Sequence, residues 1–281
     1  MTLAYWNGSY APLDQVKVSP LDRGFVFGDG VYEVVAFYGT EPFEIDAHLA
    51  RLGRSLSALR IALDPAAERL GEVLRRLRAD CGAADATVYL QVTRGAPDTR
   101  GHAFPANTRP TVFGFASPLS RLKPDALAAG FAAVTAPDIR WQRCDIKAIA
   151  LLPAVLSAQF AKENGALETI LHRDGLVTEC SSSNVLIVRE GRVVTPAADH
   201  RILDGISRQV VLRIARGIGL TVEERDVTLD ELRTADEVWV TSTTKEVAPV
   251  VSLDGAAVGQ GRPGPVWRRI RGAFDALINR G

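Results

Sequence analysis

The chain holds few side chains that could supply a primary amine. Of its 33 basic residues only five are lysines, and one of these, Lys147, ends the segment 140–147 and precedes an apolar stretch. Apolar neighbours remove water from an ammonium group, which lowers its pKa and makes the amine nucleophilic. Because most lysines are solvated surface residues, the segment alone also fits a lysine without a chemical role.

Three further segments carry polar groups that could act on a ligand. Glu179 leaves a predicted strand and enters the hydroxyl-rich turn 181–184. The segment 203–208 begins a predicted helix, whose first amides and Ser207 could bind a phosphate. The segment 241–244 adds four hydroxyls. Taken singly, these are ordinary capped turns and a helix start. Together with Lys147 they match pyridoxal phosphate, which needs an amine for its aldehyde, an acid for its ring nitrogen and donors for its phosphate.

Other common ligand sites are not predicted. The segment 259–264 fits the GxGxxG pattern, but it lies near the end of the chain, holds Pro263 and opens no βαβ unit. The sequence has no phosphate-binding P-loop, and its four histidines lack metal-ligand spacing, so we expect no metal. Three cysteines without regular spacing are expected to be reduced thiols.

Charge and hydropathy limit the classes of partner. The chain has 33 acidic and 33 basic residues and a pI near 6.9. Nucleic acids and anionic membranes attract a basic surplus, so we expect neither as a partner. No apolar stretch approaches the roughly 20 residues of a membrane span, and the first residues do not resemble a secretory signal. We therefore expect a cytoplasmic protein.

The predicted elements indicate a mixed α/β protein of two domains. Residues 1–116 form the smaller N-terminal domain, 117–124 a proline-containing linker, and 125–281 the larger C-terminal domain, which carries Lys147. Helices are predicted at 46–61, after Asp64 and Pro65 as N-cap and first helical residue, at 148–164, at 206–216 and from 263. Strands are predicted at 4–6, 10–12, 31–38, 43–45, 87–93, 110–116, 131–135, 167–171, 176–179, 185–188, 192–195, 221–225 and 237–241.

Several motifs carry a resemblance to a known family. They lie at 22–33 (DRGFVFGDGVYE), 91–95, 138–147, 171–173, 178–185 and 241–244. Through them the chain resembles the class IV (fold-type IV) pyridoxal-phosphate-dependent aminotransferases over nearly its whole length. The resemblance implies a two-domain fold with the active site in the interdomain cleft. It also implies a homodimer and a cofactor that alternates between pyridoxal phosphate and pyridoxamine phosphate.

The resemblance also implies roles for individual residues. Lys147 binds the cofactor aldehyde covalently and moves a proton, and Glu179 keeps the pyridine nitrogen protonated. Leu203 packs on the ring. The other cofactor-binding residues are Arg51, Ile206, Ser207, Ser242 and Thr243 around the phosphate, and Ser182 and Ser183 in the turn beside the cofactor. His48 is expected to support the helix of Arg51.

The substrate carboxylate is expected to bind Tyr32, Arg100 and His102, the last two from the neighbouring subunit. A guanidinium fork suits a carboxylate. In this family the Arg-x-His pattern is typical of enzymes acting on D-amino acids. The chain departs from the family pattern in a loop before Arg100 that is one residue longer, and in Cys180, where glycine is usual.

The expected activity is therefore D-amino acid transamination by a reversible ping-pong reaction. A D-amino acid such as D-alanine gives its amino group to a 2-oxo acid such as 2-oxoglutarate, producing pyruvate and D-glutamate. Alternatives within the family are a branched-chain L-amino acid or (R)-amine aminotransferase and an aminodeoxychorismate lyase. A cofactor-binding protein without catalytic activity is a further alternative.

Overall fold

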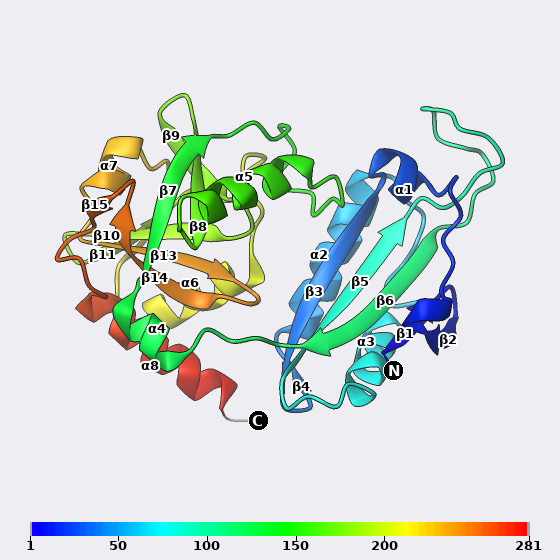
Figure 1. The fold of residues 1–281 in the computed structure, drawn as a ribbon, viewed down its shortest axis with the longest axis horizontal. Helices are drawn as coiled ribbons and strands as arrows, with labels where there is room; N and C mark the ends of the chain where they lie inside the picture. The colour runs from blue at the N-terminus through cyan, green and yellow to red at the C-terminus, as the bar shows by residue number, and fades with distance from the viewer. Residues whose placement is uncertain (1, 280–281) are drawn as a thin grey trace. The chain divides into compact units, whose positions relative to one another are not determined.

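A computed structural model describes residues 2–279, which form two compact units (Figure 1). The first contains the chain up to Leu119 together with Ile146–Leu151. The second contains Ser120–Asp145 and the chain from Leu152 onward. The chain thus leaves the first unit within the segment 117–124, where the sequence predicts a linker.

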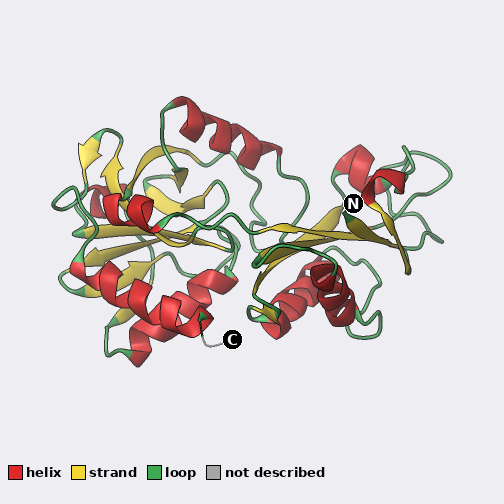
Figure 2. Ribbon diagram, turned by 60° about the horizontal axis from the view of Figure 1, so that its bottom comes forward, coloured by secondary structure: helices red, strands yellow, loops and turns green. Residues whose placement is uncertain are grey.

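The first unit is built on a six-stranded antiparallel sheet with strand order β2-β1-β6-β5-β3-β4. Its strands are β1 (Leu3–Trp6), β2 (Ser9–Pro12), β3 (Gly30–Tyr38), β4 (Glu41–Pro42), β5 (Ala86–Thr93) and β6 (Thr111–Pro118). Its helices are the 3-10 helix η1 (Leu13–Gln15), α1 (Arg23–Phe27), α2 (Ile45–Ala58) and α3 (Leu70–Ala79). Helices α2 and α3 cover one face of the sheet (Figure 2).

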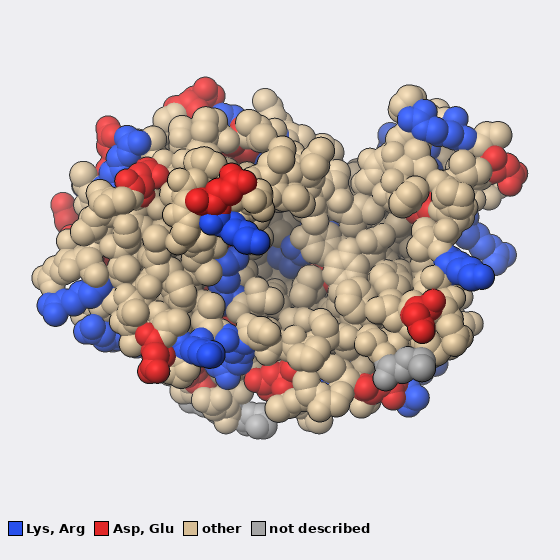
Figure 3. Space-filling view, in the orientation of Figure 1, with Lys and Arg blue, Asp and Glu red and all other residues tan. Residues whose placement is uncertain are grey.

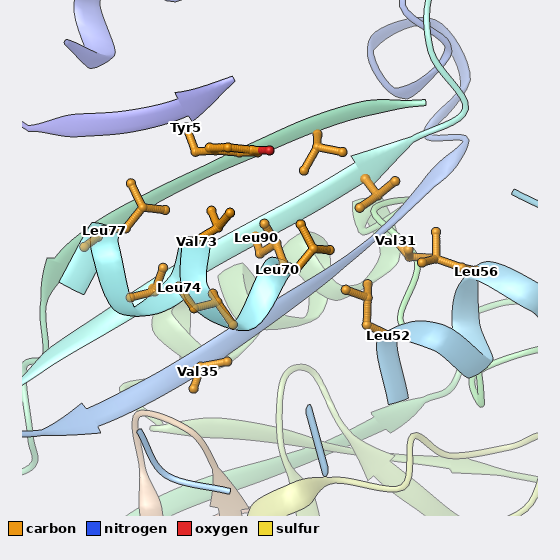
Figure 4. Close-up of a cluster of buried hydrophobic side chains, with 14 of the residues drawn as sticks. Tyr5, Val31, Val35, Leu52, Leu56, Leu70, Val73, Leu74, Leu77 and Leu90 are labelled. Atoms are coloured by element: carbon orange, nitrogen blue, oxygen red, sulfur yellow. The ribbon is translucent and has the colours of Figure 1, made fainter. Parts of the chain in front are cut away.

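The core of the first unit lies between this sheet and the two helices (Figure 4). Val31 and Val35 of β3 belong to the same buried cluster as Leu52 and Leu56 of α2. The leucines are one helical turn apart and the valines lie on the same strand face, so each pair presents one apolar surface to the other. This packing fixes β3 against α2, and both elements carry predicted site residues.

The second predicted helix of the first unit begins later than the sequence indicates. Asp64 does accept a hydrogen bond from the Ala66 amide at 2.9 Å, as an N-cap residue would. The chain then passes through turns, and Arg69 takes a left-handed conformation (φ 52°) before α3 starts at Leu70. The prediction was wrong because Asp64 caps an isolated turn rather than the helix.

The predicted strand at 43–45 is also wrong. The hairpin after β3 closes earlier, through β4, and Ile45 is already the first residue of α2. Glu44 has φ 54° and interrupts the extended backbone there, so only the turn residues Phe43 and Glu44 separate β4 from α2.

The second unit contains a nine-stranded mixed sheet with strand order β12-β11-β10-β13-β14-β7-β8-β9, and β15 pairs with β14. Its strands are β7 (Phe131–Pro137), β8 (Glu168–Arg173), β9 (Leu176–Cys180), β10 (Asn184–Arg189), β11 (Arg192–Thr195), β12 (Val222–Glu224), β13 (Glu237–Ser242), β14 (Glu246–Leu253) and β15 (Ala256–Ala257). Its helices are α4 (Pro124–Ala129), α5 (Leu152–Glu163), α6 (Ile206–Gly217), α7 (Leu229–Arg233) and α8 (Pro265–Ile278). Helix α5 packs on β7 and β8, whereas α6 and α8 pack together and against β13.

The segment that carries Lys147 is not helical, in contrast to the predicted helix 148–164. Helix α5 begins at Leu152, directly before Pro153. A proline belongs in the first turn of a helix and disfavours helical backbone before it, so the preceding residues are not helical and form tight turns instead. They run beside β3, where the Ile149 amide donates to the Gly30 carbonyl at 3.0 Å. Lys147 therefore groups with the first unit and not, as predicted, with the C-terminal domain.

The charged side chains do not gather by sign on the face shown in Figure 3, where acidic and basic groups alternate. Within residues 2–279, no helix is long and apolar enough to cross a membrane. No group of three or more His, Cys, Asp or Glu side chains in that range could hold a metal ion. The three cysteines form no disulfide.

Candidate active site

The backbone of Lys147 is fixed by two elements of the first unit. Its carbonyl accepts a hydrogen bond from the Tyr32 amide of β3 at 3.0 Å. Its amide donates to the Ser55 hydroxyl of α2 at 3.3 Å. The half-buried side chain places Nζ 4.3 Å from the centre of the Tyr32 ring, a cation–π contact. The amine thus projects from a rigid backbone and lies beside an aromatic face.

Two glycines allow close packing around the start of β3. A Cβ atom at Gly30 would lie 2.6 Å from the Val92 carbonyl oxygen, so a larger residue would disturb the pairing of β3 with β5. A Cβ atom at Gly28 would lie 3.2 Å from Cα of Ala150, in the segment that follows Lys147.

Arg51, predicted to bind phosphate, belongs to a buried charged group that the sequence did not indicate. Its Nε and Nη2 each donate to a carboxylate oxygen of Glu33 at 2.8 Å. Nδ1 of His48 lies 2.7 Å from the same carboxylate. All three side chains are at most 5% exposed. The pairing joins β3 to α2, so Arg51 helps to hold together the two elements that also hold Lys147.

Electrostatics keep Glu33 ionised in this group. Burial alone would raise the pKa of Glu33, but the Arg51 fork and His48 outweigh it and lower the pKa to about 2. Burial lowers the pKa of His48. Both pKa shifts are consistent with a neutral His48 that donates its Nδ1 proton to an ionised Glu33.

This group predicts a loss of stability in acid. The folded-state pKa of Glu33 lies below the ordinary 4.5, so its contribution is complete above about pH 4.5 and declines as the pH falls toward 2. We expect Glu33→Gln to lower the free energy of unfolding by about 3 to 5 kcal/mol near neutral pH, because it leaves Arg51 buried without its counterion. Near about pH 3 the difference from the wild type should shrink by about 2 kcal/mol, since about 1.5 pH units are worth about 1.4 kcal/mol each.

Denaturant unfolding of both proteins at the two pH values measures this difference. Glu72→Gln is the matched control, because Glu72 pairs with Arg69 on the exposed surface and should cost less than about 1 kcal/mol. A difference between wild type and Glu33→Gln that stays constant with pH would contradict the prediction.

In the second unit, the Glu179 carboxylate is held from three directions. It ion-pairs with Nη1 of Arg140. Its Oε2 accepts hydrogen bonds from Nδ2 of Asn184 and from the Leu203 amide, both at 3.0 Å. The side chain is 6% exposed. These contacts fix the position of the Glu179 carboxylate.

Arg140 and Asp138 support Glu179, and the sequence did not indicate either of them. Asp138 receives Nε and Nη2 of Arg140 at 2.9 and 2.8 Å and the Thr178 hydroxyl at 2.8 Å. Burial would raise the pKa of Asp138, but these bonds hold it below its ordinary value. Burial would lower the pKa of Arg140, but the two carboxylates raise it. Their position in the same motif as Lys147, 138–147, is the signal that could have indicated them as site residues.

The turn after Glu179 is anchored by a second buried carboxylate. Glu168, 1% exposed, accepts the Ser183 hydroxyl at 2.7 Å and Nζ of Lys245 at 3.0 Å. Lys245 also donates to the Ser182 hydroxyl at 3.0 Å. Burial would raise the pKa of Glu168, but Lys245 and the serines lower it. Of the two predicted serines, Ser183 is therefore buried on Glu168 and Ser182 is exposed. Glu168 and Lys245 were missed, although Lys245 follows the predicted turn 241–244.

The predicted phosphate-binding residues of the second unit lie close to Asn184. Its Nδ2 donates to the Leu203 carbonyl at 2.8 Å, and its backbone pairs with Thr241 of β13. Gly205 is the N-cap residue of α6, which makes Ile206 and Ser207 the first residues of that helix. The Ser242 hydroxyl accepts the Lys245 amide at 3.1 Å, and Thr243 follows it in the same turn. The helix start, with its unpaired first amides and the Ser207 hydroxyl, is suited to an anion.

The predicted carboxylate-binding residues lie in two places of the first unit. Tyr32 stacks on Tyr89 with ring centres 5.6 Å apart. Arg100 and His102 are exposed on the connection between β5 and β6, and both pack on Phe27 of α1, at 4.7 and 5.2 Å from its ring centre. Phe27 was not indicated as a site residue, although it lies in the segment 22–33.

Comparisons with known proteins agree with this chemistry. A family model described as amino-transferase class IV matches residues 30–253. A D-alanine aminotransferase of Listeria monocytogenes is 41% identical over 277 residues, covering 98% of this chain and 95% of the relative. Another from Bacillus licheniformis is 42% identical over 274 residues, covering 97% and 96%.

Solved structures match the fold as well. An Escherichia coli branched-chain amino acid aminotransferase has a TM-score of 0.89 at 28% identity and covers 98% of this chain and 94% of its own. A second branched-chain amino acid aminotransferase, from T.th. and solved with pyridoxamine 5'-phosphate, has a TM-score of 0.88 at 27% identity and covers 98% and 93%. The expected mixed α/β fold and the resemblance seen in the sequence are both confirmed. The chain belongs to the class IV aminotransferase family.

Proposed function

We propose that this enzyme is a pyridoxal-phosphate-dependent D-amino acid transaminase. It would transfer an amino group reversibly from a D-amino acid such as D-alanine to a 2-oxo acid such as 2-oxoglutarate. The observation that carries the proposal is Lys147, with its backbone bonded to Tyr32 and Ser55, in a chain 41% identical to a D-alanine aminotransferase over 277 residues. Pyridoxamine phosphate would be the alternate form of the cofactor between the two half-reactions.

The donor set of the chain fits this cofactor. Lys147 offers the primary amine and Glu179 an acid whose position Arg140 fixes. When bound, pyridoxal phosphate supplies an electron sink for the bonds at the substrate Cα. The Lys147 amine would hold the cofactor between turnovers and then remove and return the proton at the substrate Cα. Glu179 would hold a proton on the ring nitrogen.

The remaining predicted cofactor contacts stay proposals. We propose that the amides of Ile206 and Ser207 bind the phosphate at the start of α6. The hydroxyls of Ser242 and Thr243, in the turn 241–244, would be further cofactor contacts. Arg51 would add a positive charge to the same phosphate while it pairs with Glu33. Leu203 would pack on the ring, and Ser182 and Ser183 would form the turn beside it.

Substrate selection would rest on Tyr32, Arg100 and His102. A guanidinium and two further donors suit an α-carboxylate. Binding of the carboxylate on one side would present only one enantiomer's Cα proton to Lys147, which would give the preference for D-amino acids. As in the expectation from the sequence, Arg100 and His102 would come from the neighbouring subunit of a homodimer.

One exposed helix face supports the homodimer. Along α5, Leu152, Val155, Leu156 and Phe160 are 70%, 57%, 54% and 41% exposed. Their spacing places them on one side of the helix. An apolar stripe of this kind is typical of a surface that a partner covers, and we propose a second copy of this chain.

The helix face can be tested by adding charge to it. The double variant Leu152→Glu, Leu156→Glu should shift the protein from dimer to monomer in sedimentation equilibrium, because the carboxylates would be buried in the contact. Leu277→Glu makes the same change at an exposed leucine of α8, outside this stripe, and should leave the dimer intact. A double variant that stays dimeric would show that this face is not the contact.

The activity can be tested with four amino donors and 2-oxoglutarate as acceptor. D-alanine should give pyruvate and D-glutamate, whereas L-alanine, L-leucine and a chiral (R)-amine should react far more slowly. Preference for L-leucine or the amine would favour another aminotransferase of the family. Release of pyruvate from aminodeoxychorismate without an acceptor would favour the lyase. A cytoplasmic location stays a prediction.

A further inference from the structure

The residues that would select the substrate lie on a long connection without regular structure. The chain runs from 94 to 110 between β5 and β6 (Figure 1). Its two ends meet at Gly95, which has φ 98° and where a Cβ atom would lie 1.9 Å from the Arg109 carbonyl oxygen. Among the described residues, no backbone-to-backbone hydrogen bond is found for 96–105, and a turn follows at 106–107. Side-chain contacts therefore contribute much of what fixes this segment, which we call the 96–109 loop.

Arg23 of α1 donates several hydrogen bonds to the backbone of this loop. Its guanidinium donates to three consecutive carbonyls of the loop: Nη1 to Gly101 and, at 3.4 Å, to Ala103, and Nη2 to His102 at 3.1 Å. The residue is 4% exposed. Its own amide donates to the Gly95 carbonyl at 2.9 Å. One arginine thus holds the start of the loop and the stretch directly after Arg100.

Asp29 fixes the guanidinium of Arg23 in turn. Its Oδ2 accepts Nε of Arg23 at 2.7 Å and Nε of Arg94 at 2.8 Å. Burial would raise the pKa of Asp29, but the two arginines hold it below its ordinary value. Arg94 also donates to the Leu59 carbonyl, just after α2, at 2.7 Å. The loop is therefore tied to the elements that hold Lys147 and Arg51.

Phe27, one turn after Arg23 on α1, fixes the side chains of the loop. The guanidinium carbon of Arg100 lies 4.7 Å from its ring centre, and the His102 ring centre lies 5.2 Å away. Helix α1 therefore contacts the loop twice, through Arg23 at the backbone and through Phe27 at the side chains.

We infer that Arg23 is a positioning residue for substrate specificity, which fixes Arg100 and His102 so that they can bind the substrate carboxylate. The inference rests on the proposed roles of these two residues. Without Arg23 the carbonyls of 101–103 lose their guanidinium donor, although Arg94 still lies 3.6 Å from the ring centre of Phe104 in the loop. This stretch should then be more mobile, and ordering it on binding of the carboxylate should cost affinity. Loss of Arg23 should weaken substrate binding without affecting the cofactor or the chemical step.

Arg78 offers a matched control. It is also buried, at 9% exposed, and donates to the carbonyls of Gly39, Cys81, Ala83 and Ala84. It binds a different turn, near the hairpin that ends β3. Arg23→Gln and Arg78→Gln therefore remove comparable bonds from different loops, and Arg23→Lys keeps the charge beside Asp29 but not the fork.

Amide hydrogen exchange and steady-state kinetics of the holoenzyme test the inference. In Arg23→Gln we expect faster exchange in the 96–109 loop and a KM for D-alanine raised roughly tenfold, since several bonds to a charged donor are lost. The value of kcat and the absorbance of the bound cofactor should stay within about twofold. Arg23→Lys should lie between wild type and Arg23→Gln. Arg78→Gln should change neither the loop nor KM.

A double-mutant cycle separates the inference from the proposed function. Arg100→Ala should raise KM by itself, and adding Arg23→Gln should then raise it little further, because both changes remove the same function. An unchanged KM in Arg100→Ala would reject the proposed role of Arg100. A normal KM in Arg23→Gln, or an equal rise in Arg78→Gln, would overturn the inference about Arg23 while leaving Arg100 in place.

Discussion

Replacement of Lys147 with alanine is expected to abolish transamination between D-alanine and 2-oxoglutarate. The residue would supply both the covalent attachment and the base that moves the substrate proton. A positioned acid or base alone contributes about 10²- to 10⁴-fold, so we expect turnover to fall by at least about 10⁴-fold. The fold should survive, because the backbone bonds of this position, to Tyr32 and Ser55, do not involve the lost side chain.

Turnover and the visible absorbance of the bound cofactor measure this effect. Lys147→Arg is the first control: it keeps a cation beside Tyr32 but has no primary amine, so it should also be inactive. Lys162→Ala removes an exposed lysine from the last turn of α5 and should remain active. Normal transamination by Lys147→Ala would reject the assignment of the amine.

The second large effect is expected for Glu179→Gln. Glutamine keeps the size of the side chain and can still accept the bonds from Asn184 and Leu203. It removes the negative charge that would hold a proton on the ring nitrogen of the cofactor. Loss of one such electrostatic contact at a reacting group costs about 10²- to 10³-fold in kcat, which is the decrease we expect.

Asp138→Asn separates this effect from damage to the surrounding ion pairs. Asp138 is the other carboxylate on Arg140, so the variant disturbs Arg140 without removing the charge of Glu179. It should lower stability but leave kcat within about tenfold. If both variants lower kcat equally, the effect belongs to Arg140 and not to the acid. If Glu179→Gln keeps normal kcat, the proposed contact to the ring nitrogen is wrong.

Features encoded by neighbouring residues could be predicted from the sequence. The hairpin around Asn7 and Gly8 formed as expected, as did the main strands β3 and β5 and the leucine-rich helix α2. In α2 the apolar positions agree with the buried face, and in the hairpin Asn7 and Gly8 take the positive φ angles that the turn requires, so local and tertiary preferences coincide. Lys147 stood out among only five lysines because its segment belongs to the motifs that carry the family resemblance, and its role stays a prediction.

Features that depend on distant residues could not be predicted. Glu33 and Arg51 lie 18 positions apart, and Glu168 and Lys245 lie 77 apart. Their pairing depends on which strand faces which helix or turn. The residue types at the single positions do not indicate the partner. The same holds for Arg23, which reaches carbonyls almost 80 positions away. The late start of α5 was predictable in principle from Pro153, but the apolar composition favoured a longer helix.

Because Ile146–Leu151 belongs to the first unit, experiments that divide the chain must take this segment into account. Ile146 and Ala148 belong to the buried core of that unit, and Ala148 bridges to Val31. A fragment that ends at Leu119 would lack both side chains and would expose part of the edge of β3. Unpaired strand edges can pair with strands of other chains, so we expect such a fragment to aggregate. A short synthetic peptide covering 146–151 could then be added in trans, and it would carry Lys147.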